Sequence, residues 1–164
     1  PELIAYHAVS LFGGLRPTEA LLLDWKDIHL DENELQVKAD TSKTKKSRSV
    51  PINETLKAWL SSIQRPKNGR IIQTTNDREY FERLRAGLGY KVRKENPKGK
   101  KWPEDILRHS FGTYWLKIYD KESKTHNNKY VLADIMGNSP KIIEDHYKAI
   151  VKSSEAEKYW KILP

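Results

Sequence analysis

The chain has 164 residues, with 30 Lys and Arg against 22 Asp and Glu, so its formal net charge is +8. This length suits a single domain over residues 1–164 with one aromatic-rich core, and the absence of cysteine excludes a disulfide framework, a zinc ribbon, an iron–sulfur site and a thiol nucleophile. No apolar run approaches the roughly 18 residues of a membrane span, so we expect a cytoplasmic protein with no membrane partner. The positive net charge favours an anionic partner, and nucleic acid is the favoured class.

The first third of the chain predicts two helices and a small antiparallel sheet. Apolar residues recur at helical spacing over 3–12 and stop at a Gly-Gly pair, after which Pro17 stands at the first position of a second helix. Alternating apolar and polar residues over 28–39 predict a hairpin. After a polar and basic turn, residues 48–51 predict a third short strand that ends at its proline, because proline cannot donate to the ladder.

The rest of the chain is expected to be mostly helical. Asn53 is placed to cap a helix that extends to Ile63. Further helices are predicted over 77–88, from Pro103, over 131–136, from Pro140 to Ile150 and from Ser154, with a basic loop over 91–101 and a polar loop over 120–129. The predicted fold class is mainly α with one small antiparallel β-sheet (α+β).

Several common sites can be rejected from the residues. The segment Gly13-Gly14-Leu15-Arg16 lacks the spacing and the lysine of a phosphate-binding loop, and no His-Glu-x-x-His occurs. The five histidines show no ligand pairing, and the carboxylates form no evident two-metal cluster. We therefore expect no metal and no cofactor, and keep a metal-dependent nuclease as a weaker alternative that a chelator would distinguish.

Three cations stand at positions that favour an anion site. Arg16 follows the Gly-Gly break, Lys43 lies on the predicted hairpin turn, and Arg108 sits among core residues of a helix. A guanidinium with apolar neighbours is costly unless it has an anionic partner. Two arginines and a lysine that converge on one phosphate would form a phosphoryl-transfer site without a metal, with a tyrosine near the C-terminus as the candidate nucleophile.

Four motifs, in order, resemble those of the catalytic domain of tyrosine recombinases, the phage integrase family. They occupy residues 13–20, 41–51, 105–111 and 136–147, and the resemblance extends from Tyr6 to about Val151. It implies the fold of DNA breaking–rejoining enzymes and a site-specific recombinase or integrase of a phage or mobile element. Two positions depart from the family pattern: Asp105 stands where the family usually has His, and Asn138 where it has His or Trp.

The resemblance also implies the role of each candidate residue. Tyr147 would attack a phosphodiester of double-stranded DNA and form a 3′-phosphotyrosyl link, while Arg16 and Arg108 bind the non-bridging oxygens. Lys43 would protonate the leaving 5′-oxygen. An amide at Asn138 can still donate to a phosphate oxygen, whereas Asp105 could accept the tyrosine proton but would repel the phosphate unless the arginines neutralise it.

Supporting roles and alternatives follow from the same motifs. Glu19 is expected to orient Arg16 or the helix that follows it, and His109 to support the site. Taken singly, the candidates have ordinary explanations: surface cations for Arg16 and Lys43, a buried ion pair of Arg108 with Glu19 or Asp105, a core aromatic for Tyr147, and a cap of the next helix for Asn138. Tyr114 and Tyr159 compete as nucleophiles but lack the preceding Gly-Asn box. The two departures favour, as the alternative, a catalytically impaired DNA-binding protein of the same fold.

DNA affinity is expected to come mainly from contacts with phosphates. The candidate cations are Lys45, Lys46, Arg48, Lys91, Arg93, Lys94, Lys98, Lys100 and Lys101. The resemblance further implies a synaptic tetramer on DNA, in which residues 152–164 could pack in trans or fold back in cis. Because family members usually carry an upstream helical DNA-clamping domain, we expect this chain to be a fragment that lacks it.

Overall fold

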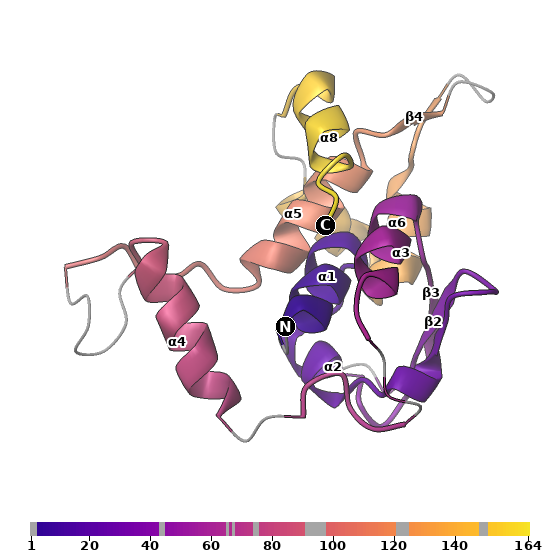
Figure 1. Ribbon diagram of the computed structural model, residues 1–164. Coiled ribbons are helices and arrows are strands. Elements are labelled where there is room, and N and C mark those ends of the chain that lie inside the picture. The colour runs from indigo at the N-terminus through magenta and orange to yellow at the C-terminus, as the bar shows by residue number, and fades with distance from the viewer. Residues whose placement is uncertain are drawn as a thin grey trace.

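Helix α1 (Ile4–Phe12) is the element around which the other helices are arranged (Figure 1). The computed structural model describes residues 3–42, 45–64, 66, 68–73, 76–90, 98–120, 125–147 and 151–164. Helix α1 packs against α2 (Pro17–Leu22), α3 (Glu54–Ser61) and α5 (Ile106–Trp115). Its buried side chains include Val9 and Phe12, which repeat at helical spacing and so face one core. The predicted first two helices are confirmed.

The turn between α1 and α2 depends on a glycine. Gly14 has φ +66°, a left-handed conformation that favours glycine, and a Cβ atom there would lie 2.3 Å from the ring of Phe111 in α5. Close packing of this turn on α5 therefore brings the start of α2 next to the middle of α5. Asn53 caps α3 as predicted, since its Oδ1 accepts a hydrogen bond from the backbone N–H of Leu56 at 2.9 Å.

A three-stranded antiparallel sheet follows the short 3-10 helix η1 (Trp25–Asp27). Its strands β1 (Ile28–His29), β2 (Glu34–Val37) and β3 (Arg48–Pro51) lie in the order β1-β2-β3. The register pairs Ile28 with Leu35 and Leu35 with Val50, so three buried side chains form a row across the core-facing side of the sheet. This confirms the predicted hairpin and third strand.

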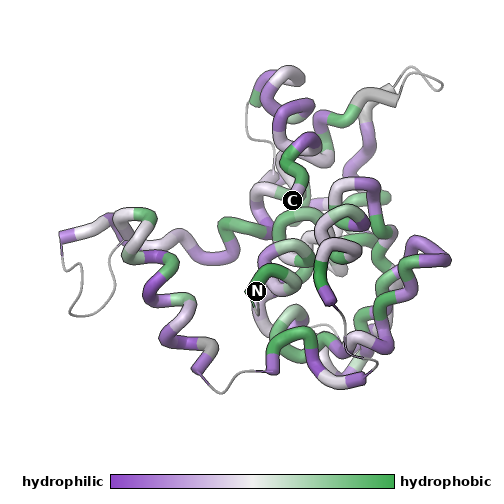
Figure 2. The backbone as a smooth tube through the Cα atoms, viewed as in Figure 1, coloured by the Kyte–Doolittle hydropathy of each residue, from purple (hydrophilic) through white to green (hydrophobic). Residues whose placement is uncertain are grey.

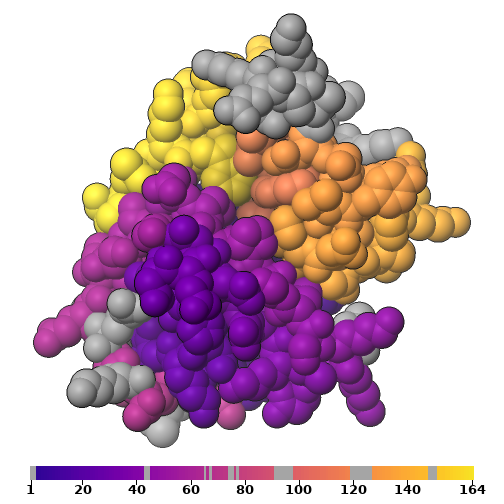
Figure 3. Space-filling model, turned by 90° about the vertical axis from the view of Figure 1, so that its right-hand side faces the viewer, coloured from indigo at the N-terminus to yellow at the C-terminus, as the bar shows by residue number. Residues whose placement is uncertain are grey.

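The C-terminal half is helical and lies beside the sheet. Helix α6 (Lys129–Met136) packs against β3 and against α7 (Pro140–His146), and Figure 3 shows the N-terminal and C-terminal colours meeting on one face. The more hydrophobic stretches gather at the centre of the molecule, whereas α4 (Asp77–Gly87) and the turn between β1 and β2 are largely hydrophilic (Figure 2). Helix α4 stands apart from the main body and touches it through Phe81, whose ring lies 4.7 Å from that of Tyr6.

The last helix, α8 (Ser153–Tyr159), lies against α5 of its own chain. The Tyr159 hydroxyl donates to the carbonyl of Leu11, and the Trp59 indole donates to the carbonyl of Ile162 at 2.8 Å. Residues 152–164 thus fold back in cis in this single chain, and their packing in trans stays a prediction.

Three elements differ from the sequence-based expectation. Helix α7 ends at His146 rather than at Ile150, because the backbone of Tyr147, with φ −119° and ψ 8°, leaves the helical range. A second, two-stranded sheet, β4 (Tyr119–Asp120) with β5 (Thr125–His126), lies where a polar loop was predicted. The sequence does not predict it, because strands of two residues are too short to show an alternation of apolar and polar residues. Helix α5 begins at Ile106 rather than near Pro103, because Asp105 has φ +50°, outside the range of a right-handed helix. None of the described helices combines the length and the apolar character that a bilayer span requires.

Candidate active site

The carboxyl end of α6 collects guanidinium groups from distant parts of the chain. Arg16, at the start of α2, donates to the carbonyls of Met136 at 3.3 Å and Gly137 at 3.0 Å. Arg108, from α5, donates to the same Met136 carbonyl at 2.5 Å. The last carbonyls of a helix have no intrahelical partner and carry partial negative charge, so they stabilise cations placed against them. Backbone acceptors thus hold the two predicted arginines side by side.

A third guanidinium, that of Arg48 on β3, joins this cluster. Its Nε donates to the carbonyl of Ile135 at 2.8 Å, and its two Nη atoms donate to the two oxygens of Glu19 at 2.9 and 2.7 Å. Gly137 has φ +61°, and a Cβ there would lie 3.2 Å from the Arg48 guanidinium. Gly137, which ends α6, therefore also leaves room for the guanidinium of Arg48.

Glu19 is a fully buried carboxylate that links two of the arginines. Its side chain is 0% exposed, and besides Arg48 it accepts from Arg16 Nη1 at 3.1 Å and from the Arg16 backbone N–H at 2.9 Å. Burial alone would raise the pKa of Glu19, but hydrogen bonds and positive charge from Arg48 and Arg16 outweigh it and hold the pKa below its usual value. The carboxylate is therefore ionised at neutral pH, and it contacts Arg16 as expected.

Arg108 is buried and is held by main-chain acceptors. Arg108 is only 2% exposed, and its Nη1 donates to the carbonyl of Gly14 at 2.5 Å in addition to the contact of Nη2 with Met136. Burial and the nearby charge of Arg16 lower the pKa of Arg108 to about 10, although Tyr147 and Glu19 act in the opposite direction. These contacts differ from the ion pair with Glu19 or Asp105 that was the alternative.

Tyr147 follows α7 directly and packs on α5. It is 4% exposed, and its ring stacks on that of His109 with centroids 4.8 Å apart and planes 24° from parallel. A Cβ at Gly112 would lie 2.4 Å from the Tyr147 ring, so glycine is needed there for this approach. Burial lowers the pKa of His109, with Asp105 opposing and the charges of Arg108 and His146 adding to the decrease, so the imidazole beside Tyr147 is neutral at pH 7.

Five of the six predicted catalytic residues line one cleft of about 990 Å³. They are Arg16, Arg108, Asn138, Tyr147 and Asp105, and His109 lines the same cleft. Lys43 lies outside the described residues, although Lys46 and Ser47, near the other end of the same turn, also line the cleft. Residues separated by more than 130 positions are thereby brought to a common surface.

Asn138 contacts Arg16 rather than capping α7. Its Oδ1 accepts a hydrogen bond from Arg16 Nη2 at 2.5 Å. The cap of α7 is Ser139, whose hydroxyl accepts from the Ile142 N–H at 3.3 Å, so the alternative role of Asn138 as a cap is wrong.

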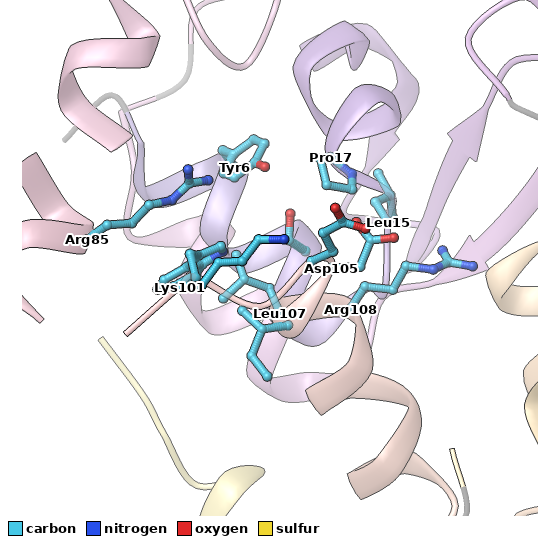
Figure 4. Close-up of a pocket in the computed structure, with 12 residues that line it drawn as sticks. Tyr6, Leu15, Pro17, Arg85, Lys101, Asp105, Leu107 and Arg108 are labelled. Carbon is cyan, nitrogen blue, oxygen red and sulfur yellow. The ribbon is translucent and has the colours of Figure 1, made fainter. Parts of the chain in front are cut away.

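Asp105 lies between the cleft and a neighbouring cavity of about 460 Å³ (Figure 4). Arg108 lines both spaces as well. Figure 4 shows Arg85 of α4 and Lys101 on the side of this cavity opposite Arg108. Asp105 is exposed, so its carboxylate is open to solvent at the edge of the cationic cluster.

The nine predicted DNA-binding cations fall into three groups. Those described and exposed are Lys45, Lys46, Lys98, Lys100 and Lys101, while Lys91, Arg93 and Lys94 lie outside the described residues. Arg48 differs from them, because its side chain is 9% exposed and both Nη atoms are bound to Glu19. The signal for this was present in the sequence: Arg48 stands two residues before the core residue Val50 and so shares its face of the strand.

The competing tyrosines serve the core. Tyr159 is buried, its hydroxyl is bound to the carbonyl of Leu11, and its ring stacks on Tyr114 at 4.3 Å. Burial raises the pKa of Tyr159, with a smaller contribution from Tyr114, and neither ring lines the cleft. Within the described ranges, no three His, Asp or Glu side chains come close enough to hold a metal ion.

Comparisons with known proteins bear on the family and the fold of the chain. Residues 5–118 match the phage integrase family, a span that contains the first three motifs. The solved structure titled "Crystal structure of XerA recombinase" is similar, with a TM-score of 0.61 and 23% identity over 98% of this chain and 57% of that chain, so the chain spans little more than half of that protein. No curated protein matches the sequence. The predicted fold is confirmed, and since the match covers most of its length, the chain belongs to the phage integrase family.

Proposed function

We propose that this chain is the catalytic domain of a tyrosine-type site-specific recombinase that cleaves and rejoins double-stranded DNA. The observation that carries the proposal is the meeting of Arg16, Arg108 and Tyr147 at one cleft, from three distant motifs. Two guanidinium groups offer the planar, multiple donors that suit a phosphodiester, and the phenol is the nucleophile beside them.

Binding of a phosphate requires an exchange of partners at Arg16. Its Nη atoms donate to Glu19, Met136, Gly137 and Asn138. Of these acceptors, the Asn138 amide is a side chain in the cleft that can rotate. The phosphate oxygen takes its place on Arg16, and the turned amide donates its own N–H to the phosphate.

Cleavage then proceeds by displacement at phosphorus. The Tyr147 oxygen forms a bond to phosphorus and loses its proton to a base, for which Asp105 at the edge of the cleft is the candidate. The bond from phosphorus to the 5′-oxygen breaks, and Lys43 gives that oxygen a proton. Arg16 and Arg108 stabilise the charge that develops on the non-bridging oxygens. Because the phosphotyrosyl link is itself a phosphodiester, it preserves the free energy of the broken DNA linkage. Rejoining therefore requires neither ATP nor a metal.

Affinity for DNA is assigned to the exposed lysines on both sides of the cleft. Lys45 and Lys46 precede β3, and Lys98, Lys100 and Lys101 precede α5. Their contacts are with phosphates and carry little sequence information. A synaptic tetramer, exchange of residues 152–164 between subunits and a cytoplasmic location belong to the same proposal.

A covalent-trapping assay tests the proposal. The full-length protein is incubated with a pool of nicked DNA duplexes of randomised sequence and resolved under denaturing conditions, with and without EDTA. We expect a covalent complex that persists in EDTA and is lost in Tyr147→Phe. Tyr130→Phe is the matched control, because it removes a hydroxyl from a tyrosine 63% exposed on α6 and should leave the complex unchanged. A covalent complex formed by Tyr147→Phe, or an absolute requirement for Mg²⁺, would contradict the proposal.

A second candidate is a DNA-binding protein of the same fold with impaired catalysis. Asp105 and Asn138 favour it, since an acid and a neutral amide replace the usual cationic or aromatic groups. Salt-dependent binding of duplex DNA by the wild-type protein, with no covalent complex at any pH, would select this candidate.

A further inference from the structure

We propose that Arg48 is a positioning residue for DNA cleavage, which holds Arg16 in place through Glu19 and fixes the preceding turn to the end of α6. The inference rests on the proposed function. It gives Arg48 a role other than the phosphate contact that the basic turn predicted.

The contacts of Arg48 account for all three nitrogen atoms of its guanidinium. Nη1 and Nη2 form a two-pronged contact with the Glu19 carboxylate, and Nε reaches the Ile135 carbonyl. Such forked arginine–carboxylate pairs define direction as well as distance. Arg48 lines the cleft, but its Nη atoms are bound to Glu19 and its side chain is only 9% exposed, so it is poorly placed to donate to a DNA phosphate.

Glu19 transmits this constraint to Arg16. The Glu19 oxygen that accepts from Arg48 Nη1 also accepts from Arg16 Nη1, and its other oxygen accepts from the Arg16 backbone N–H. Glu19 has no solvent to replace a lost partner, because it is fully buried. Without Arg48 the carboxylate would keep only its contacts with Arg16, so the orientation of Glu19, and with it that of the Arg16 guanidinium, would be less constrained at the cleft.

The same contact anchors the basic turn. Arg48 is the first residue of β3, and the residues directly before it, Lys46 and Ser47, line the cleft. Strand β3 packs on α6, whose last carbonyls hold Arg16 and Arg108. One side chain therefore ties the turn, the buried carboxylate and the arginine-binding helix end together.

The main test measures the rate of covalent-complex formation at saturating DNA for the full-length wild type, Arg48→Gln and Arg48→Lys. Because misplacing a group by about 1 Å can cost about 10²-fold in rate, we expect a loss of this order for Arg48→Gln. DNA affinity should stay within about twofold, and Arg48→Lys should lose less because it keeps the charge but not the fork. Equal rates for all three proteins would overturn the inference.

A double variant separates positioning from simple stabilisation. Arg48→Gln alone leaves Glu19 buried without its main partner and could unfold the protein. The double variant Glu19→Gln/Arg48→Gln removes that uncompensated charge, so its melting temperature should recover towards that of the wild type while cleavage stays slow. Recovery of both properties would show that Arg48 acts only on stability and would overturn the inference.

Two further measurements do not depend on cleavage. In the salt dependence of binding to a random-sequence duplex, Arg48→Gln should leave the slope unchanged, whereas loss of a phosphate contact lowers it by about 0.9. In ¹⁵N NMR without DNA, the Nη–H signals of Arg16, assigned with Arg16→Lys, should exchange faster in Arg48→Gln, because Arg16 donates to Glu19 through Nη1. An unchanged Arg16 signal or a lowered slope would overturn the inference. A wild type that forms no covalent complex would overturn the proposed function, and the Arg16 signal would still decide whether Arg48 holds Arg16.

Discussion

The end of α6 and the surface of α4 use charged residues in opposite ways. At the end of α6, Arg16 and Arg48 share the buried carboxylate of Glu19, and all three arginines, including Arg108, donate to main-chain carbonyls with little access to solvent. On α4, Arg83 pairs with Glu79 at 2.8 Å, and both side chains are more than half exposed. An exposed pair exchanges water for a partner at little net gain, whereas a buried charge depends on its partner. The burial of an ion pair, and not the number of ion pairs, therefore decides how much a charged residue contributes to the stability of this protein.

The largest expected effect is on stability, from Glu19→Gln. Glutamine keeps one acceptor oxygen but not the negative charge that Arg48 and Arg16 share, and breaking a buried ion pair costs about 3–5 kcal/mol. The free energy of unfolding from urea titration measures this. Glu79→Gln on α4 is the matched control, with an expected change of about 0.2–0.5 kcal/mol. Similar values for the two variants would abolish the contrast between the two regions.

The pH dependence of stability should follow from the same carboxylate. Because the folded-state pKa of Glu19 lies below its reference value of 4.5, its ion pairs stabilise the fold above that pH and are lost as the pH falls through the folded pKa. Glu19→Gln should therefore lose less stability than the wild type on acidification below about pH 4.5. Parallel curves for the two proteins would show that Glu19 is not held in the ionised form by its partners.

A second contrast concerns catalysis by Arg108 and by an exposed arginine. Arg108→Lys cannot reach Gly14, Met136 and a phosphate together, so we expect the rate of covalent-complex formation to fall by about 10²–10³-fold, the effect of losing a transition-state donor. Arg83→Lys should leave that rate unchanged. A full rate in Arg108→Lys would mean that Arg108 only supports the fold.

The smallest expected effect is on DNA affinity, and it tests whether the exposed lysines, unlike the buried Arg48, contact DNA. Lys45→Ala and Lys46→Ala should each lower the slope of log affinity against log salt concentration by up to about 0.9, since both side chains are exposed and Lys46 lines the cleft. Fluorescence anisotropy with a random-sequence duplex measures the slope. Unchanged slopes would place the DNA elsewhere on the surface.

Much of the fold could be predicted because local signals agree with the tertiary structure. Gly13-Gly14 and Pro17 bound the first two helices, Asn53 caps α3, and the alternation over 28–39 gives the hairpin. The β4–β5 ladder escaped prediction because two-residue strands leave no periodic pattern. The start of α5 escaped because the left-handed backbone of Asp105 has no clear sequence signature for a residue other than glycine.

The candidate site was predictable in its members but not in its contacts. Motif spacing selected Arg16, Arg108, Asn138 and Tyr147, and the structure brings these residues to one cleft. The partners of Arg108 could not be read from side-chain types, because they are main-chain carbonyls. Arg48 was assigned to the DNA surface since its neighbours are exposed lysines, although its register beside Val37 places it on the buried face.

The carbonyls that receive Arg108 have a consequence for how the family can diversify. A carbonyl belongs to every amino acid, so substitutions at Met136 that preserve the helix end leave the acceptor for Arg108 intact. Sequence drift is restricted instead at glycines: Gly14, Gly112 and Gly137 face an aromatic ring or a guanidinium at distances that exclude a methyl group or crowd it. The arrangement of the arginines at the end of α6 therefore tolerates substitution of many surrounding side chains, provided that these glycines are kept.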